Sequence, residues 1–224
     1  MTRLLIFYPY FTPAYKAGGP VQSIKNLVDL VKDDFEIDVV CSAFDLGQTE
    51  MLSNIVADEW NRLSETVCVL YIKSNVYKTI TAVISERRPD IIYLNGIFLP
   101  FFSWLPLILA KANNVPVIIT PRGMLHRGAM AAKSFKKNIS IRLLKSLNLL
   151  RNVTWQATDD QEAQDIRSYF GQRVEVRLVG NVPRSPMKTN TLVQKEKGDL
   201  KLVFLSLIAR KKNLDLILRT LKEV

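Results

Sequence analysis

The 224-residue sequence has only two cysteines, Cys41 and Cys68, and a single histidine, His126. Two cysteines exclude a disulfide-stabilised scaffold, and no Cys-x-x-Cys pair or Cys/His cluster indicates a zinc site. The single histidine excludes any mechanism that needs two. With only nine glycines and ten prolines, the chain is neither collagen-like nor a linker. The simplest interpretation is a globular protein of a reducing, cytoplasmic compartment.

Acidic residues are missing from a long stretch of the chain. No Asp or Glu occurs from Ile91 to Thr158, whereas nine Lys and Arg fall there, and the formal net charge of the whole chain is +10. A surface of one sign attracts anions such as phosphates, nucleic acid or an acidic membrane. Aromatic residues are not interleaved with this basic stretch as base stacking requires, so we expect no nucleic-acid partner.

One run without charges, from Ile91 to Ala110, approaches the length of a membrane span. Asn95-Gly96, Pro100 and Pro106 interrupt it, which favours a strand, a loop and a buried helix.

Elsewhere, short runs rich in Val and Ile alternate with segments of helical periodicity. This alternation predicts a parallel sheet with helices on both faces, an α/β Rossmann-like doubly wound domain. A Thr158-Asp159-Asp160-Gln161 sequence has the form of a capping box that starts a helix. The expected strands are 3–8, 35–41, 66–72, 90–94, 115–120, 153–157 and 175–179, and the expected helices are 20–31, 76–88, 101–113, 133–150 and 158–170.

The composition changes near residue 183. Residues 183–199 hold two prolines and several polar residues and read as a linker between domains. A strand at 200–205 and a helix at 213–224 are expected after it. Such a pair cannot bury its own apolar faces. We therefore expect a domain at 1–182, a linker at 183–199, and at 200–224 the truncated start of a second Rossmann-like domain of a longer protein.

Ligands of open parallel sheets bind at the carboxyl ends of strands, and two glycine- or cation-rich loops occur there. Gly18-Gly19-Pro20 follows the first strand and opens a helix, so backbone N–H groups can approach an anion. The pattern is not Gly-x-Gly-x-x-Gly, so a dinucleotide is not indicated. Arg210-Lys211-Lys212 precedes the last helix and suits a diphosphate. The alternative interpretation of the glycine pair is a tight turn, and the alternative interpretation of the three cations is a solvated surface run.

Two further loops follow the fourth and fifth strands. Asn95-Gly96 is a turn pair that can also contact a ligand. Arg122, in a loop shaped by Pro121 and Gly123, is well placed for a phosphate or carboxylate. His126 lies in the same loop, where packing or helix capping competes with catalysis as its role.

The predicted helix 133–150 is amphipathic and basic. Its apolar residues at helical spacing are Phe135, Ile139, Leu143, Leu147 and Leu150. The sequence leaves two interpretations open: the helix lies on an anionic membrane surface, or it packs by this stripe on its own sheet.

Taken in order, four segments resemble glycosyltransferase family 4, whose GT-B fold has two facing Rossmann-like domains. They are Gly18-Gly19-Pro20 with Ser23, Pro121-Arg122-Gly123-Met124-Leu125, TDDQEAQDI at 158–166, and FLSLIARKKNLDLIL at 204–218. The PRGML loop is the most specific of the four and points to a PRGML-type branch.

The resemblance implies a retaining transfer from a nucleotide-sugar donor to a saccharide or lipid-linked saccharide acceptor in surface polysaccharide synthesis, without a metal or other cofactor. It implies that the N-terminal domain binds the acceptor. The candidate catalytic residues are Arg122 and His126. The candidate donor-diphosphate residues are Gly18, Gly19, Arg210 and Lys212, and the candidate acceptor residues are Asn95, Gly96 and Gly123.

Lys212 matches the family's Lys, but Leu207 stands at the position of the family's Arg, and Arg210 compensates only if the loop differs in shape. The family's donor-binding glutamates belong to the second domain, so we expect residues 1–224 alone to be inactive. We expect the protein in the cytoplasm, in peripheral contact with the inner face of the membrane. The alternatives are a nucleotide-sugar epimerase or hydrolase of the same fold, and a non-catalytic saccharide- or anion-binding module.

Overall fold

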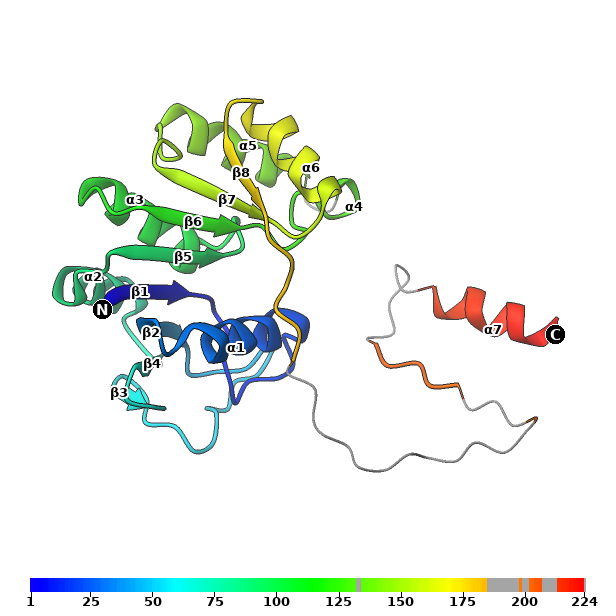
Figure 1. Cartoon of the computed structure of the whole chain (residues 1–224), viewed down its shortest axis with the longest axis horizontal. Coiled ribbons are helices and arrows are strands. Elements are labelled where there is room, and N and C mark those ends of the chain that lie inside the picture. The colour runs from blue at the N-terminus through cyan, green and yellow to red at the C-terminus, as the bar shows by residue number, and fades with distance from the viewer. Residues whose placement is uncertain (132–133, 185–197, 199–201, 207–212, 224) are drawn as a thin grey trace. The chain divides into compact units, whose positions relative to one another are not determined.

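A computed structural model of the chain describes residues 1–131, 134–184, 198, 202–206 and 213–223. Its sheet has the strand order β3-β4-β2-β1-β5-β6-β7-β8, and all neighbours are parallel except β3 and β4 (Figure 1). This topology confirms the predicted Rossmann-like α/β fold. The strands are β1 (Thr2–Phe7), β2 (Phe35–Ser42), β3 (Trp60–Arg62), β4 (Val67–Ile72), β5 (Ile91–Asn95), β6 (Val117–Thr120), β7 (Val153–Ala157) and β8 (Glu175–Leu178).

Helices cover both faces of the sheet unequally. On one face, α1 packs Val21, Ile24 and Val28 against β1, β2 and β4. The other face is covered by α2, α3, α5 and α6, whose apolar residues form the larger core around Trp155 and Leu94. The helices of this unit are α1 (Gly19–Val31), α2 (Val76–Arg87), η1 (Pro100–Trp104), α3 (Leu105–Ala112), α4 (Arg127–Ala131), α5 (Ser134–Ser146) and α6 (Asp160–Phe170).

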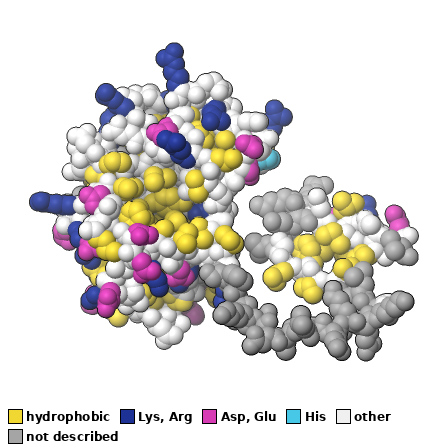
Figure 2. Space-filling model, viewed as in Figure 1, with side chains coloured by type: hydrophobic (Ala, Val, Ile, Leu, Met, Phe, Trp, Pro, Cys, Tyr) yellow, Lys and Arg dark blue, Asp and Glu magenta, His cyan; other side chains and the backbone are white. Residues whose placement is uncertain are grey.

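Beyond α1, the first face of the sheet stays open. A groove of about 330 Å³ lies there, and apolar side chains line most of it, including Leu27 of α1, Ile118 of β6 and Val179 after β8. Figure 2 shows apolar side chains gathered between α1 and β8, where this groove lies. The groove ends at Arg122, so it adjoins the carboxyl edge of the sheet.

Several elements differ from the sequence prediction, among them the short helix α4, which was expected to be loop. The short edge strand β3 was not predicted, because three residues are too few to show alternation. The expected helix 101–113 divides into the π-helical turn η1 and the α-helix α3, each with a proline in its first turn. Proline lacks an N–H and is best tolerated there, which explains the division at Pro106.

The cap of α6 lies one residue later than predicted. Asp159, not Thr158, is the N-cap, and its side chain accepts a 2.8 Å hydrogen bond from the Glu162 N–H. Thr158 donates instead to Glu162 through both its N–H and its hydroxyl. Both residue types cap helices well, so the sequence alone did not separate them.

The chain divides into two compact units, Met1–Ser185 and Pro186–Val224. In the second unit, α7 (Leu214–Lys222) begins after Asn213, as expected for a helix at 213–224. A strand was expected at 200–205. Its described residues, 202–205, are not in a strand, and they pair with no described strand. Without such a neighbour, the backbone hydrogen bonds of a sheet cannot form. The predicted start of a second Rossmann-like domain stays a prediction.

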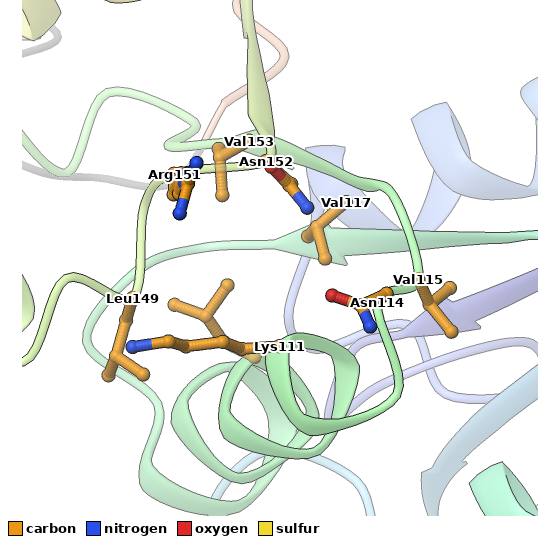
Figure 3. A pocket seen from close by; sticks show the side chains of 9 residues that line it. Lys111, Asn114, Val115, Val117, Leu149, Arg151, Asn152 and Val153 are labelled. Atoms are coloured by element: carbon orange, nitrogen blue, oxygen red, sulfur yellow. The ribbon is translucent and has the colours of Figure 1, made fainter.

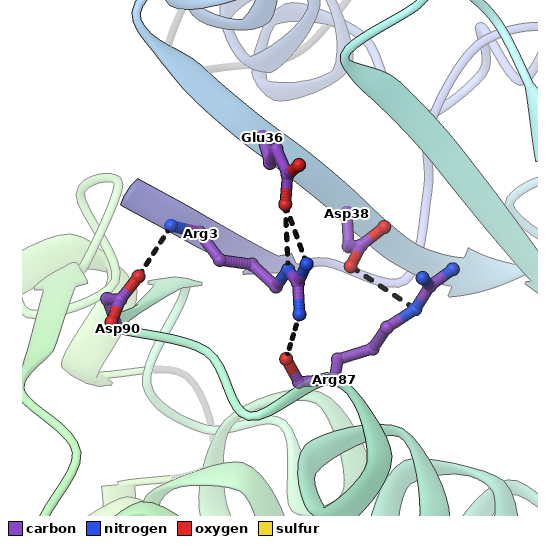
Figure 4. Close-up of polar contacts among 5 residues, drawn as sticks. All are labelled: Arg3, Glu36, Asp38, Arg87 and Asp90. Carbon is purple, nitrogen blue, oxygen red and sulfur yellow. Dashed lines mark hydrogen bonds and ion pairs between the residues drawn. The ribbon is translucent and has the colours of Figure 1, made fainter. Parts of the chain in front are cut away.

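At the amino edge of the sheet, charged side chains join β1, β2 and α2 (Figure 4). Arg3 donates to Glu36 at 2.6 Å and to the Arg87 carbonyl at 2.5 Å, and its own N–H donates to Asp90. Arg87 lies 3.4 Å from Asp38. Burial raises the pKa of Asp38 although Arg87 opposes the shift, whereas Arg3 lowers the pKa of Glu36. This network fixes where β1 and β2 begin.

In the described part of the chain, no helix combines the length and the apolar character needed to cross a membrane.

Candidate functional site

Arg122 connects three segments at the carboxyl edge of the sheet. Its Nε and Nη2 donate to Asn95 Oδ1 at 3.2 and 2.9 Å, at the end of β5. Its Nη1 donates to Ser23 Oγ of α1 at 2.9 Å and to Asn181 Oδ1 after β8. Ser23 also donates to Asn181 at 3.1 Å. The guanidinium is therefore held over the first turns of α1 by neutral oxygen atoms.

In the described part of the chain, no carboxylate forms an ion pair with Arg122. The side chain is only half-buried. A guanidinium that is oriented but not neutralised is suited to a second, anionic partner such as a phosphate.

The first turn of α1 adds positive potential beside Arg122. The N-cap is Gly18 at φ +72°, a conformation that favours glycine, and no side chain caps the helix. Apart from its chain neighbours and its own helix backbone, a methyl group added at Gly19 would meet no atom of the described residues within 4 Å, so space is open above the helix start. Uncapped N–H groups and the helix dipole together attract an anion.

A buried carboxylate shapes the loop that carries Arg122. Glu162 is only 5% exposed. Its Oε1 accepts from the Gly123 N–H at 2.7 Å, and its Oε2 accepts from Thr158 N–H and Oγ1, both at 2.8 Å. Arg122 and Gly123 have positive φ, +54° and +72°. These hydrogen bonds hold that turn and direct Arg122 towards α1.

These residues surround a cleft of about 500 Å³. A volume of this size is typical of small-molecule sites. Six of its ten lining residues have polar side chains, and the lining comes from α1, the 121–123 loop, the residue two positions before α6 and the segment after β8. The lining residues are Gly19, Pro20, Gln22, Ser23, Asn26, Arg122, Gly123, Thr158, Asn181 and Val182.

Two fully buried polar groups lie beneath Arg122. Asn95 and Thr120 are 0% exposed, and neither Asn95 Nδ2 nor Thr120 Oγ1 has a hydrogen-bond partner among the residues that the structure describes. An unpaired buried polar group costs about 1–3 kcal/mol. The cost at Asn95 is offset by its two hydrogen bonds from Arg122, which give this residue a role in positioning the guanidinium.

Nearby tyrosines stay neutral. Burial raises the pKa of Tyr93, although the Arg122 guanidinium opposes that shift, and burial also raises the pKa of Tyr8. Tyr93 donates to Gln156 Oε1 at 2.7 Å, which joins β5 to β7. Among the described residues that line the cleft, Arg122 is the one with a charged side chain.

The structure brings some of the predicted site residues together and separates others. Gly19, Arg122 and Gly123 line the cleft, and Gly18 caps the helix beside it. Asn95 is beneath Arg122 rather than at the surface. Arg210 and Lys212 lie outside the described residues.

Gly96 and His126 have structural roles in this arrangement. Gly96 has φ +93°, a conformation that L side chains rarely adopt, and the Met124 side chain packs against it, so the turn after β5 favours glycine. His126 is exposed, does not line the cleft, and accepts a 3.4 Å hydrogen bond from the Gly128 N–H at the start of α4. This contact fits helix capping, one of the interpretations open from the sequence, and the catalytic role of His126 stays a prediction.

The sequence did not identify Asn181, Glu162 or Asn26 as site residues. Asn26 Nδ2 donates to the Val182 carbonyl at 2.9 Å, so α1 holds the segment after β8 through both Ser23 and Asn26. These hydrogen bonds join positions more than 150 residues apart, which local sequence patterns do not reveal. The one available signal was the position of Asn181 shortly after the predicted strand 175–179.

A different cavity, of about 350 Å³, lies at the opposite end of the strands, between the starts of β6 and β7 (Figure 3). Lys111, Asn114 and Arg151 surround an apolar floor there. Lys111 donates to the Leu147 carbonyl at 2.7 Å and so attaches α3 to the turn after α5. Ligands of open parallel sheets bind at the carboxyl ends of strands, which favours the Arg122 cleft as the site.

Among the described residues, no three His, Cys, Asp or Glu side chains gather in a way that could hold a metal ion.

Comparison with known families agrees with the fold. Residues 18–182 match the glycosyl transferase 4-like domain, so the chain belongs to this family. The matched range starts at the helix cap Gly18 and ends at Val182, the last residue that lines the cleft. No curated protein matches the chain in sequence.

Solved structures share the fold at low sequence identity. Sucrose-phosphate synthase from Thermosynechococcus elongatus aligns over 80% of this chain and 48% of its own, with a TM-score of 0.57 and 15% identity. A second structure of that synthase aligns over 80% of this chain and 88% of its own, with a TM-score of 0.51 and 12% identity. The chain thus spans about half the length of the first structure.

Proposed function

We propose that the chain is the acceptor-binding half of a retaining glycosyltransferase. The enzyme would transfer a sugar from a nucleotide-sugar donor to a saccharide or lipid-linked saccharide in surface polysaccharide synthesis. The observation that carries the proposal is the Arg122 guanidinium, held by Asn95 and Ser23 over the uncapped start of α1. Family membership supports sugar transfer as the reaction class.

The chemistry needs such a group. As the bond between the anomeric carbon and the donor phosphate breaks, negative charge develops on the departing nucleoside diphosphate. Oriented N–H groups and cations in a shielded cleft stabilise that charge. An arginine remains protonated at any physiological pH, so Arg122 cannot take the proton of the acceptor hydroxyl. Its proposed role is electrostatic, on the diphosphate, and needs no metal ion.

Gly18 and Gly19 would contribute backbone N–H groups to the same diphosphate, and Arg210 and Lys212 are proposed as its cations from the second unit. Gly123 and the 95–96 turn flank Arg122, and we propose that the acceptor approaches on their side. Because Asn95 and Gly96 are buried, their contribution to acceptor binding would be indirect.

The experiment is a product analysis with the longest natural form of the protein. Radiolabelled nucleotide sugars are incubated with lipid extracts and with free saccharides. A new glycosidic bond with the anomeric configuration of the donor supports the proposal. Release of free sugar or a changed sugar nucleotide would instead establish a hydrolase or an epimerase. Binding of saccharide without turnover would establish a binding module.

Residues 1–224 serve as the first control in this assay. We expect no turnover by this chain, because the family's donor-binding glutamates belong to the second domain. Arg122→Ala in the long form should lower kcat/KM by about 10²–10³-fold, the effect of removing one charge-stabilising donor. Arg127→Ala, at an exposed position outside the cleft, is the matched control and should leave kcat/KM within about twofold.

A further inference from the structure

Helix α5 has two apolar faces, and among the described residues only one of them packs on the core. Ile141 and Leu144 are 5% and 0% exposed and belong to the larger core. Four of the five residues of the predicted stripe lie on the other face: Phe135, Ile139, Leu143 and Leu147 are 77, 39, 43 and 51% exposed. We call these four residues the α5 stripe. The fifth residue, Leu150, packs against the larger core, so packing on the sheet, one of the two interpretations open from the sequence, holds for that residue alone.

The stripe is continuous. Its members are four residues apart, and at 3.6 residues per turn they cover an arc of about 120°. The Leu147 N–H donates to the Leu143 carbonyl at 3.0 Å, so the helical path extends to the last member. In Figure 1, α5 lies at the periphery of the folded unit, behind β7 and β8. An exposed apolar stripe of this length is a common mark of an interaction surface.

Basic side chains border the stripe. On the helix, Lys136 and Arg142 fall about 60° to either side of Ile139, and both are exposed. No ion pair between described residues includes a side chain of α5. At the far end of the stripe, Lys111 of α3 contacts the Leu147 carbonyl. In Figure 2, Lys and Arg side chains project from the upper part of the unit, where β8 and α6 lie.

No acidic residue lies between Ile91 and Thr158, so the segments of α3, α4 and α5 carry positive charge alone. The surface thus combines apolar side chains for insertion with cations at their borders. We propose that the α5 stripe docks on an anionic lipid bilayer, with Phe135, Ile139 and Leu143 inserted between head groups and Lys136 and Arg142 on the lipid phosphates. Charge complementarity favours this occupant over a second copy of the chain, whose α5 would bring equal positive charge.

Amphipathic helices bind in the plane of the interface by apolar burial and by attraction to anionic lipid. Apolar insertion and attraction to anionic lipid differ in how vesicle binding depends on salt. Attraction to anionic lipid weakens as salt shortens the Debye length from about 10 Å at 0.1 M. Apolar insertion does not depend on salt in this way. A surface that uses both should lose affinity on removal of either.

The test is flotation of the 224-residue chain with two kinds of vesicle. One kind is phosphatidylcholine alone, and the other contains about 40% phosphatidylglycerol, where attraction to anionic lipid is strong. The wild type should bind the anionic vesicles and lose binding in about 0.5 M salt, which screens surface charges. Phe135→Ser with Lys136→Gln should lower the affinity by about tenfold or more.

A matched control exists on α2, where Tyr77 and Lys78 form the same aromatic–lysine pair, both exposed. Tyr77→Ser with Lys78→Gln should leave vesicle affinity within about twofold. Absent binding by the wild type, or equal losses in the two double variants, would overturn the proposal. So would a dimer in sedimentation that Phe135→Ser abolishes without any vesicle binding, since the stripe would then join two copies.

Vesicle binding needs neither donor nor acceptor. Failure of this experiment would therefore leave sugar transfer untouched, and failure of the transferase assay would leave the membrane surface untouched.

Discussion

Arg122 donates two hydrogen bonds to the single oxygen Asn95 Oδ1, from the loop after β6 to the end of β5. The amide orients the guanidinium without cancelling its charge. An aspartate at this position would form an ion pair and remove the attraction for an anion. The choice of a neutral, fully buried partner therefore keeps the cation available to a ligand in the cleft.

Removal of the arginine should destabilise the fold as well as the site. Arg122→Ala leaves Asn95 Oδ1 buried without a donor, and we expect a loss of about 1–3 kcal/mol in the free energy of unfolding. Urea unfolding followed by circular dichroism measures it. Arg127→Ala, which removes an exposed side chain, should change it by less than about 0.5 kcal/mol. Equal effects of the two substitutions would contradict the contact between Arg122 and Asn95.

The two glycines of the site should respond differently to alanine. Gly19→Ala adds a methyl group to open space at a helix start, so stability should be kept while anion affinity falls. Gly96→Ala places a Cβ 2.8 Å from Met124 Cε at φ +93°, and we expect a loss of about 2 kcal/mol or more. Thermal unfolding and pyrophosphate titration separate these outcomes. A destabilised Gly19→Ala variant would refute the open space above α1.

Glu162 should need both of its oxygens. Glu162→Gln replaces one carboxylate oxygen, an acceptor, with an NH₂ group, a donor. In either orientation of the amide, this NH₂ group faces a backbone N–H, that of Gly123 or that of Thr158, and two donors cannot form a hydrogen bond. We expect a loss of about 1–3 kcal/mol and faster amide exchange at Gly123. Glu175→Gln, at an exposed carboxylate of β8, is the control. Unchanged exchange at Gly123 would show that Glu162 does not hold the loop.

The amino-edge carboxylates should give opposite pH dependences. Burial raises the pKa of Asp38 above its ordinary value of 3.8, so the folded protein loses stability as the pH rises through the folded pKa. Arg3 lowers the pKa of Glu36, so its contribution is present above pH 4.5 and is lost as the pH falls through the folded pKa.

Asp38→Asn should therefore gain stability relative to the wild type as the pH rises, and Glu36→Gln should lose stability relative to the wild type over the same change. Urea unfolding at several values between about pH 3 and pH 7 measures both differences. If both variants gained, or both lost, stability relative to the wild type as the pH rises, the assignment of burial to Asp38 and of pairing with Arg3 to Glu36 would be contradicted.

Most of the fold followed from periodicity. The predicted strands 3–8, 35–41, 66–72 and 90–94 are apolar runs whose bounds lie close to those of β1, β2, β4 and β5. Because segments of helical periodicity follow most of them, the parallel sheet was predictable. The strand β3 was not, because Trp60–Arg62 is too short to show alternation and is defined by its pairing with β4. The division between η1 and α3 follows from the positions of Pro100 and Pro106, and the spacing of apolar residues does not reveal it.

The site was predictable where a loop follows a buried strand. Arg122 stood out because Pro121 and Gly123 fix its loop at the end of β6. Its partners did not, since Ser23 and Asn181 lie 158 residues apart and meet only in the folded chain. The sequence also found the apolar stripe of α5, but not that Ile141 and Leu144 would occupy the core in its place. The binding roles of the site residues stay predictions.

The most direct test of the central claim is calorimetric titration of the 224-residue chain and its Asn95→Asp variant with pyrophosphate. Within the described residues Asn95 Nδ2 has no hydrogen-bond partner, so a carboxylate oxygen in its place removes no bond seen there, and the variant should melt at or above the wild-type temperature. We expect the wild type to bind pyrophosphate and the variant to bind it about tenfold or more weakly, because the introduced carboxylate would neutralise Arg122. Equal affinities, or no binding by the wild type, would contradict a diphosphate site at Arg122.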